Sequence, residues 1–287
     1  MKVEEINGSV VVTDLEFFSV AQTFDCGQSF RFKVTVSDGE ARADGIAFGR
    51  RVSFIQSADN TLTVTPSTQE EFERIWSHYL ALDADYAAIR REMSELRPND
   101  SILISAMDSG RGIRILRQDP WEALCTFIIS QNNNIPRITG LVAALCRAAG
   151  QRIEDGEGYA FPTPQAVMAL GVEGLFALKT GFRASYLYDA ASKVCSGEVD
   201  LKSVRSFSTE EAEKALRVIR GVGPKVAACS LLFGFEKQDA FPIDVWVKRV
   251  MAEFYPEGIA PVEFGRYAGL AQQYLFFFRR WKLEAKN

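Results

Sequence analysis

The chain turns sharply at Gly221-Val222-Gly223-Pro224-Lys225, a short stretch that separates two apolar segments. Apolar residues precede it at helical spacing, at Ala212, Ala215, Leu216 and Ile219. After it, residues 226–235 are apolar nearly all round. Glycine commonly ends a helix, and proline is favoured at the first position of the next one. The stretch therefore predicts two helices joined by a tight turn, with the second helix buried.

This turn and a later aspartate predict a reactive site. Backbone N–H groups of residues 221–225 face outward at the start of a helix, where they can bind a phosphate. Asp244 follows Pro242, a helix breaker, and is placed to cap a helix that begins near Val245. The amine of Lys225 and the carboxylate of Asp244 could then face one substrate. A phosphate site, an amine and a carboxylate together indicate chemistry on DNA.

The first hundred residues have a different pattern. Residues 30–36 alternate apolar and polar side chains before a Ser-Asp-Gly turn, and β-rich runs follow at residues 46–55 and 61–65. Helical spacing begins near Gln69, and strand signals nearly vanish after Pro98. We therefore predict an α+β chain, with an N-terminal antiparallel β-rich domain at 1–97 and a larger all-helical domain at 98–287.

Composition limits the class of protein. The 287 residues are 47% hydrophobic, and no apolar run approaches the roughly 20 residues of a membrane span. The five cysteines are odd in number and widely spaced, which favours reduced thiols over disulfides or a zinc site. We expect a cytoplasmic protein without membrane partners, and a monomer.

A net charge of −4 argues against a protein that binds nucleic acid over its whole surface. Any contact with DNA must then be local. One hypothetical patch lies between positions 109 and 152, where arginines greatly outnumber acids: Arg111, Arg114, Arg117, Arg137, Arg147 and Arg152. Such runs are also typical of solvated faces, so both readings stay open.

Several ordered blocks then resemble a known family. Residues 216–250 resemble the helix-hairpin-helix, Gly/Pro-Asp signature of base-excision DNA glycosylases, with the lysine of the members that cleave through an amine. The other blocks occur in the order of the 8-oxoguanine DNA glycosylase family: Asp25-Cys26-Gly27-Gln28-Ser29-Phe30-Arg31, Leu116-Arg117-Gln118-Asp119-Pro120, Gln131-Asn132-Asn133-Asn134-Ile135-Pro136-Arg137-Ile138-Thr139-Gly140 and Gly181-Phe182-Arg183-Ala184. The resemblance covers most of the chain.

The resemblance implies a bifunctional glycosylase and lyase. Lys225 would attack the sugar carbon C1′ as a neutral amine, form a Schiff base and allow strand cleavage by β-elimination. Ordinary lysine is protonated near neutral pH, so burial and the positive end of its helix are expected to disfavour the ammonium. Asp244 would stabilise positive charge on the sugar.

Recognition roles also follow from the resemblance. The carbonyl of Gly27 would accept the N7 proton that distinguishes 8-oxoguanine from guanine. Cys229 and Phe276 would sandwich the extruded base, and Gln272 would contact its Watson–Crick edge. Contacts to the opposite cytosine and to the DNA backbone are expected from Asn132, Arg137, Phe182, Arg183, Gly221, Val222, Gly223 and Trp246.

Trp246 departs from the family, which has a phosphate-binding histidine there. An indole cannot become cationic, so we expect altered affinity rather than lost activity.

No cofactor is expected to be required, and no iron–sulfur cluster, because no cysteine follows Cys229. The carbonyls of Arg217, Ile219 and Val222 could hold a structural cation, as in relatives. The expected partner is double-stranded DNA containing 8-oxoguanine, and the expected location is a bacterial or archaeal nucleoid, because no basic import cluster is present.

Two alternatives remain open from the residues. A glycosylase for alkylated purines would activate water through Asp244 and leave Lys225 idle. A non-catalytic helix-hairpin-helix DNA-binding protein would leave Gly27, Cys229, Gln272 and Phe276 without a common purpose.

Overall fold

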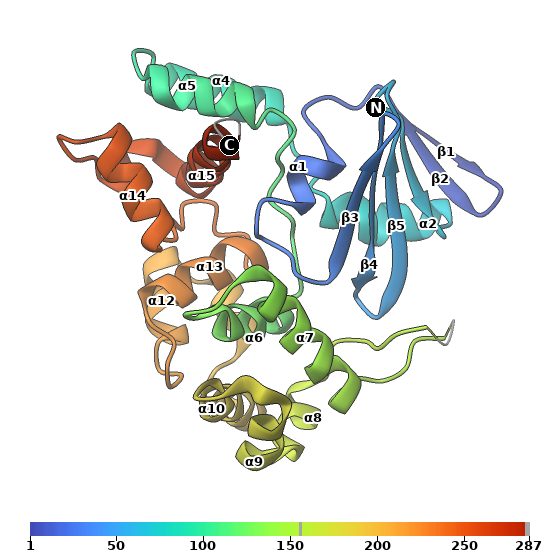
Figure 1. Cartoon of the computed structure of the whole chain (residues 1–287), viewed down its shortest axis with the longest axis vertical. Helices are drawn as coiled ribbons and strands as arrows, with labels where there is room; N and C mark the ends of the chain where they lie inside the picture. The colour runs from blue at the N-terminus through green and yellow to red at the C-terminus, as the bar shows by residue number, and fades with distance from the viewer. Residues whose placement is uncertain (155–156, 285–287) are drawn as a thin grey trace.

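A computed structural model describes residues 1–154 and 157–284, with side chains described to residue 280. A twisted antiparallel sheet forms one part of the molecule and a larger group of helices forms the rest (Figure 1). The predicted α+β class is confirmed. The strands, in the sheet order β1-β2-β6-β5-β4-β3, are β1 (Lys2–Ile6), β2 (Ser9–Thr13), β6 (Leu62–Thr65), β5 (Arg50–Gln56), β4 (Glu40–Ala47) and β3 (Phe32–Ser37).

The predicted β-rich runs correspond to strands with two corrections. The run at 46–55 is not one strand, because Phe48 and Gly49 both have positive φ and form the turn between β4 and β5. The strand expected from Phe30 begins at Phe32. Strands β1 and β2 were not predicted, since β1 is a largely exposed edge strand with mostly polar residues and β2 lacks alternation.

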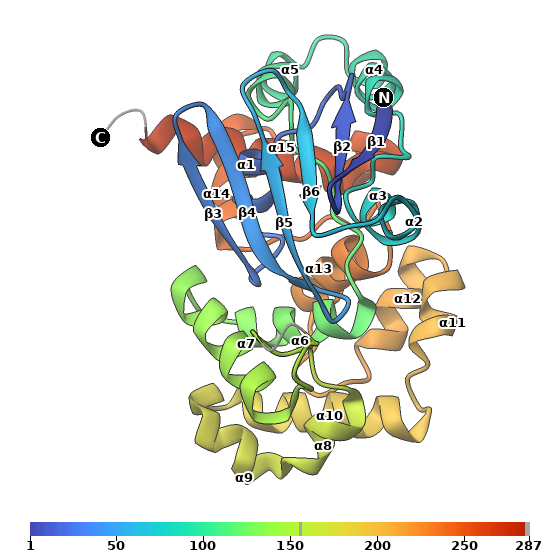
Figure 2. The same cartoon turned by 90° about the vertical axis from the view of Figure 1, so that its right-hand side faces the viewer.

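Some helices pack against the sheet, and the remaining helices form a separate group that extends away from it (Figure 2). A short group packs on the sheet: α1 (Val20–Phe24), α2 (Gln69–Glu71), the π-helix η1 (Phe72–Trp76) and α3 (Ser77–Tyr79). The remainder comprises α4 (Tyr86–Leu96), α5 (Ser101–Ser109), α6 (Pro120–Ser130), α7 (Ile135–Ala149), α8 (Pro164–Ala169), α9 (Gly171–Leu175), π-helix η2 (Phe176–Thr180), α10 (Arg183–Ser196), α11 (Leu201–Ser206), α12 (Thr209–Leu216), α13 (Pro224–Gly234), α14 (Val245–Phe254), 3-10 helix η3 (Pro261–Tyr267) and α15 (Ala268–Glu284). Among the described residues, no helix is both long and apolar enough to cross a bilayer.

The buried side chains form two apolar clusters. One lies between the sheet and its covering helices and includes Phe54, Trp76 and Tyr79. The other unites the helices from α4 onward. Because α4 packs into the second cluster, its residues 86–96 belong physically with the helices that follow them, although they precede the domain boundary predicted at 97.

Arg114 joins the two parts instead of contributing to a surface patch. Its side chain is 4% exposed, and its guanidinium donates to the carbonyls of Glu16, Phe17, Ala81 and Ala84. Arg117 pairs with Asp83 and Glu236. The hypothetical basic patch at 109–152 is therefore wrong as a unit, since tertiary contacts consume part of its charge.

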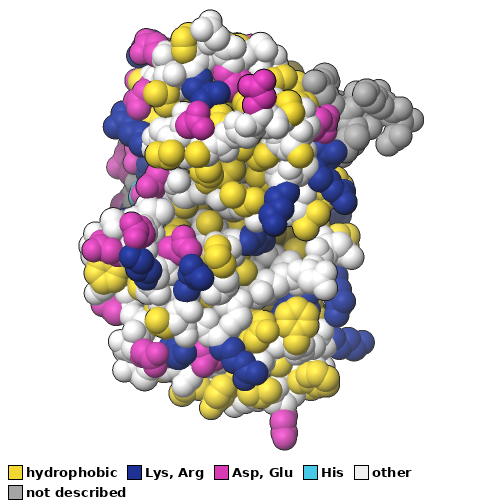
Figure 3. Space-filling view, turned by 90° about the vertical axis from the view of Figure 1, so that its left-hand side faces the viewer, with side chains coloured by type: hydrophobic (Ala, Val, Ile, Leu, Met, Phe, Trp, Pro, Cys, Tyr) yellow, Lys and Arg dark blue, Asp and Glu magenta, His cyan; other side chains and the backbone are white. Residues whose placement is uncertain are grey.

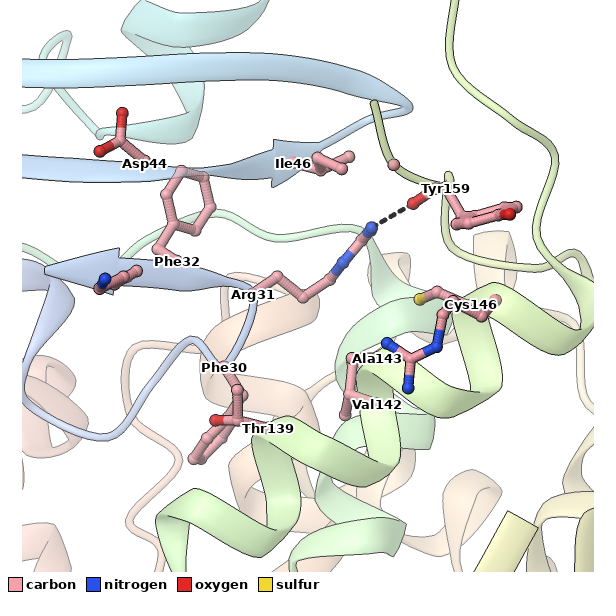
Figure 4. A pocket seen from close by; sticks show the side chains of 13 residues that line it. Phe30, Arg31, Phe32, Asp44, Ile46, Thr139, Val142, Ala143, Cys146 and Tyr159 are labelled. Atoms are coloured by element: carbon pink, nitrogen blue, oxygen red, sulfur yellow. Dashed lines mark hydrogen bonds between the residues drawn. The ribbon is translucent and has the colours of Figure 1, made fainter. Parts of the chain in front are cut away.

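Arg31 forms a second connection. Its guanidinium lies 3.3 Å from the Glu122 carboxylate of α6 and also donates to the Tyr159 carbonyl at 2.5 Å. Figure 4 shows Arg31 crossing a cavity of about 290 Å³ between β3, β4 and α7. Burial raises the pKa of Glu122 to about 7, although Arg31 acts in the opposite direction. The Arg31 contact therefore depends on the charge of a carboxyl that titrates near neutral pH.

The predicted pair of helices is α12 and α13. Gly221 between them has φ +79°, and a Cβ there would lie 2.2 Å from the ring of Tyr186 on α10. Gly223 caps α13 in an extended conformation, with open space where a Cβ would lie. Only the first glycine is therefore required by both conformation and packing.

We predict that Gly221→Ala destabilises the protein by at least about 2 kcal/mol, because an L-residue in the left-handed region and a clash in a packed site both cost free energy. Gly223→Ala, the matched control, should cost about 1 kcal/mol or less. Urea unfolding of both variants measures this. Equal losses of stability would contradict the packing argument.

Glu122→Gln should alter the pH dependence of stability. The folded-state pKa is raised above its ordinary value of 4.5, so the contribution of this carboxyl is complete below that value and is lost as pH rises through about 7. Wild type should lose about 3 kcal/mol relative to the Gln variant over this range. Urea unfolding from pH 4.5 to 8 tests it, and parallel curves would refute it.

Candidate active site

A cavity of about 470 Å³ lies where the segment before β3 meets α6, α13, α14 and α15. Residues far apart in sequence line it together, and they include seven of the predicted site residues: Gly27, Lys225, Cys229, Asp244, Trp246, Gln272 and Phe276. Figure 3 shows the side of the molecule that carries α12 and α14, with apolar side chains gathered across its hollowed middle and Lys and Arg side chains along one edge. Tertiary structure thus gives the predicted reactive and base-contacting groups one location.

Lys225 lies in the first turn of α13 and is half-buried. Its Nζ is 3.2 Å from Ser130 Oγ, at the end of α6, and 5.5 Å from the ring centroid of Phe127. Ser130 Oγ donates its own proton to the Phe127 carbonyl at 2.8 Å. The hydroxyl can therefore only accept from Lys225, so this contact directs one N–H of the lysine toward the end of α6.

Sequence reasoning missed Ser130. The only signal was its place directly before the Gln131-Asn132-Asn133-Asn134 block, at the end of a strongly apolar segment. A lone serine in that position normally satisfies its own helix, as the bond to Phe127 also shows. Only the packing of α6 against α13 reveals its second contact.

Asp244 caps α14, as predicted. One carboxylate oxygen accepts the Val247 N–H at 2.7 Å, which fixes the side chain at the start of the helix. The other oxygen has no hydrogen bond from any part of the chain that the structure describes. Asp244 lines the same cavity as Lys225 without forming an ion pair with it in the described structure. The cap therefore positions the carboxylate and leaves it available to a cation in the cavity.

Three of the predicted base-contacting residues line the cavity from α13 and α15. Cys229 lies one turn after Lys225, and burial raises the pKa of its thiol while the lysine acts the other way. A thiol kept protonated is an apolar, polarizable wall. Phe276 is partly buried, and Gln272 is 4% exposed with its Oε1 accepting from Gln273 Nε2 at 2.8 Å. That bond fixes which way the Gln272 amide is turned.

Gly27 has φ +79°, and nothing lies within 4 Å of the position of a Cβ. Its conformation, not lack of space, requires glycine. The next residue, Gln28, is fully buried: its Nε2 donates to the Thr23 and Arg114 carbonyls at 2.8 Å, and its Oε1 accepts from Leu116 at 2.8 Å. Gln28 thus anchors the turn that contains Gly27, a role that the sequence did not reveal.

Four further predicted residues lie on two neighbouring segments. Asn132 is in the α6–α7 loop with φ +47°, and Arg137 is exposed in the first turn of α7. Phe182 is 50% exposed, while Arg183 is 2% exposed with its guanidinium 4.4 Å from the Phe182 ring. Arg183 donates to the carbonyls of Gln131 and Asn132, so it holds the Asn132 loop. Its predicted contact with cytosine would require these bonds to change.

The hairpin between α12 and α13 carries the remaining predictions. Gly221, Val222 and Gly223 connect the helices, and the Ile219 carbonyl accepts the Val222 N–H at 3.0 Å. A carbonyl oxygen has two lone pairs, and the hydrogen bond from Val222 uses one of those on Ile219. The second lone pair remains compatible with binding a cation. Within residues 1–154 and 157–284, no cluster of His, Cys, Asp and Glu forms a metal site.

Comparisons with known proteins show which family the chain resembles. The family model described as "8-oxoguanine DNA glycosylase, N-terminal domain" matches residues 10–124, and the one described as "HhH-GPD superfamily base excision DNA repair protein" matches 125–259. The N-glycosylase/DNA lyase OGG1 of Arabidopsis thaliana is 30% identical, over 88% of this chain and 75% of the plant protein. The N-glycosylase/DNA lyase of Saccharomyces cerevisiae is 37% identical, over 51% of this chain and 43% of the yeast protein.

A solved structure is similar over nearly the whole length. The 8-oxoguanine glycosylase/lyase of Clostridium acetobutylicum, in complex with double-stranded DNA containing cytosine opposite 8-oxoG, is 37% identical with a TM-score of 0.89, and 99% of each chain is covered. Sequence, fold and the assembled cavity thus agree. The chain belongs to the 8-oxoguanine DNA glycosylase family of the helix-hairpin-helix, Gly/Pro-Asp superfamily, and it is a bifunctional DNA N-glycosylase and lyase.

Proposed function

We propose that this protein excises 8-oxoguanine from duplex DNA, preferably opposite cytosine, through a Schiff base on Lys225, and then cleaves the strand by β-elimination. The observation that carries the proposal is the Lys225 amine, held by Ser130 in a cavity that Asp244 also lines. Relatives named N-glycosylase/DNA lyase supply independent support.

The reaction begins with extrusion of the damaged nucleotide, because C1′ is inaccessible in stacked DNA. The amine of Lys225 forms a bond to C1′ while the bond from C1′ to the base breaks, and the base leaves with that electron pair. One amine proton passes to the departing base, and the nitrogen lone pair then forms the C=N bond as the C1′–O4′ bond breaks and O4′ takes up a proton, which gives the protonated Schiff base. Removal of a proton from C2′ expels the 3′ phosphate, which completes β-elimination.

Each polar group of the cavity has a separate task in this scheme. Ser130 accepts a hydrogen bond from the amine and so orients it. Asp244, fixed by its cap, stabilises the positive charge that develops on the sugar. The reaction needs no redox cofactor, and the hairpin carbonyls of Arg217, Ile219 and Val222 could hold a cation beside a DNA phosphate.

One set of residues recognises the damaged base, and another set recognises the base opposite it. Gly27 presents its carbonyl to the N7 proton of 8-oxoguanine, while Cys229 and Phe276 enclose the ring and Gln272 contacts its edge. On the other side, Asn132 fills the vacated space, Phe182 wedges beside it, and Arg137 with Arg183 donates to the acceptor edge of cytosine. The last role of Arg183 follows only if it releases the loop carbonyls that it now binds.

Borohydride trapping tests the nucleophile. Wild type should form a covalent adduct with an 8-oxoguanine duplex, and Lys225→Gln should form none. Ser130→Ala should slow trapping about 2- to 10-fold under single turnover, the value of one neutral hydrogen bond, with duplex affinity nearly unchanged. Ser130→Thr keeps the acceptor and is the matched control.

An undiminished adduct in Lys225→Gln would exclude the proposed chemistry. If 3-methyladenine were released faster than 8-oxoguanine, without trapping, the alternative in which Asp244 activates water would replace it. A shift of the pH–rate profile in Ser130→Ala, absent in Ser130→Thr, would separate a role in orienting the amine from a purely structural one.

Arg137→Gln should reduce the preference for cytosine, because the Watson–Crick edge of that base presents two adjacent acceptors, O2 and N3, to a cationic donor. Single-turnover cleavage opposite each of the four bases measures this. Arg147→Gln changes the same charge near the other end of α7 and should leave the preference intact. Equal rates opposite all four bases in wild type would reject the cytosine role altogether.

A further inference from the structure

Two guanidiniums lie over the indole that lines the mouth of the base cavity. Trp246 is 48% exposed, with Arg249 of the same helix 5.2 Å and Arg279 of α15 5.7 Å from its ring. Trp246 and Arg249 are three residues apart on α14, so they share a face of the helix. The indole thus restricts where the Arg249 side chain can lie.

The two arginines are not equivalent. Arg279 donates to Glu253 at 2.8 Å, so a carboxylate compensates its charge. Arg249 is exposed and has no ion pair within the described part of the chain. A guanidinium stacked on a ring keeps its in-plane N–H donors free, and these match the oxygens of a phosphate. Arg249 is therefore a restrained cation with open donors.

The position of this cation suggests its ligand. When a base enters the cavity and its sugar reaches Lys225, the phosphates on either side of that sugar remain at the mouth. Trp246 and Asp244 both line this cavity, Trp246 is half-exposed, and Asp244 starts the helix that carries Arg249. A phosphate here would meet the in-plane donors of Arg249, while the N-terminus of α14 is already occupied by the Asp244 carboxylate.

We propose that Arg249, held on Trp246 and flanked by Arg279, binds a backbone phosphate next to the extruded nucleotide. The indole supplies no charge of its own but fixes the cation that does. The proposal rests on the DNA substrate proposed above, yet it concerns binding and not the Lys225 chemistry.

Salt-dependent binding tests the proposal. The ligand is a duplex with a tetrahydrofuran abasic analogue opposite cytosine, which has no base to release and cannot form a Schiff base. Fluorescence anisotropy from about 50 to 200 mM salt should show that Arg249→Gln flattens the slope of log K against log salt by about 0.9, the value of one lost phosphate contact. Affinity at the lowest salt should fall about 5- to 10-fold.

Lys248→Gln is the matched control, because it removes one charge from the adjacent position of α14. Lys248 lines a different cavity with Ile243, Met251 and Tyr255, so its loss should change the slope by less than half as much as Arg249→Gln does. Trp246→Phe should retain most of the affinity for the duplex. In the Trp246→Ala background, Arg249→Gln should change the salt slope less than it does in wild type.

An unchanged slope in Arg249→Gln, or equal changes in Arg249→Gln and Lys248→Gln, would overturn the proposal. A second result would also overturn it. If Trp246→Ala weakened duplex binding without changing the salt slope, and Arg249→Gln still had its full effect in that variant, the indole would contact DNA directly and would not act through Arg249. Absence of trapping by wild type would reject the proposed reaction and leave this result standing.

Discussion

The approach of α6 to α13 is the constraint on which the site depends. Phe127 and Phe233 stack with ring centroids 5.3 Å apart, and a Cβ on Gly234 would lie 2.8 Å from that of Ala123. Small side chains thus let the two backbones come close. This approach brings Ser130 within hydrogen-bonding distance of Lys225, so the packing of two buried helices sets the direction of the amine.

The two parts of the molecule contribute different properties to one cavity. The helical part supplies the amine and the carboxylate, while the segment before β3 supplies the Gly27 carbonyl. Gln28, Arg114 and the Arg31–Glu122 pair connect these parts through buried polar contacts. These contacts hold the turn at Gly27 in place against the helices that carry Lys225 and Asp244.

The acidic net charge is compatible with a DNA-binding face because the cations are placed individually. Arg114 and Arg183 direct their donors to backbone carbonyls, whereas Arg137 and Arg249 remain exposed. The same residue type therefore serves the interior and the surface. Sequence position alone did not separate these uses, which is why the arginine-rich stretch at 109–152 left open both a DNA-binding patch and a solvated face.

The sequence by itself determined the features that local rules control. The two glycines, Pro224 and the apolar run after them specified α12, the turn and α13, and the polar cap at Asp244 specified the start of α14, because turn and capping preferences act within a few residues. Ordered motif blocks also identified the family. Only the tertiary structure decided that Ser130 holds the amine, that Gln28 anchors Gly27, that Arg183 faces inward and that Arg249 lies on Trp246. Most of these contacts join segments far apart in the chain, and Arg279 of α15 reaches the same indole as Arg249, so hydrogen bonding and burial become defined only after the whole core has packed.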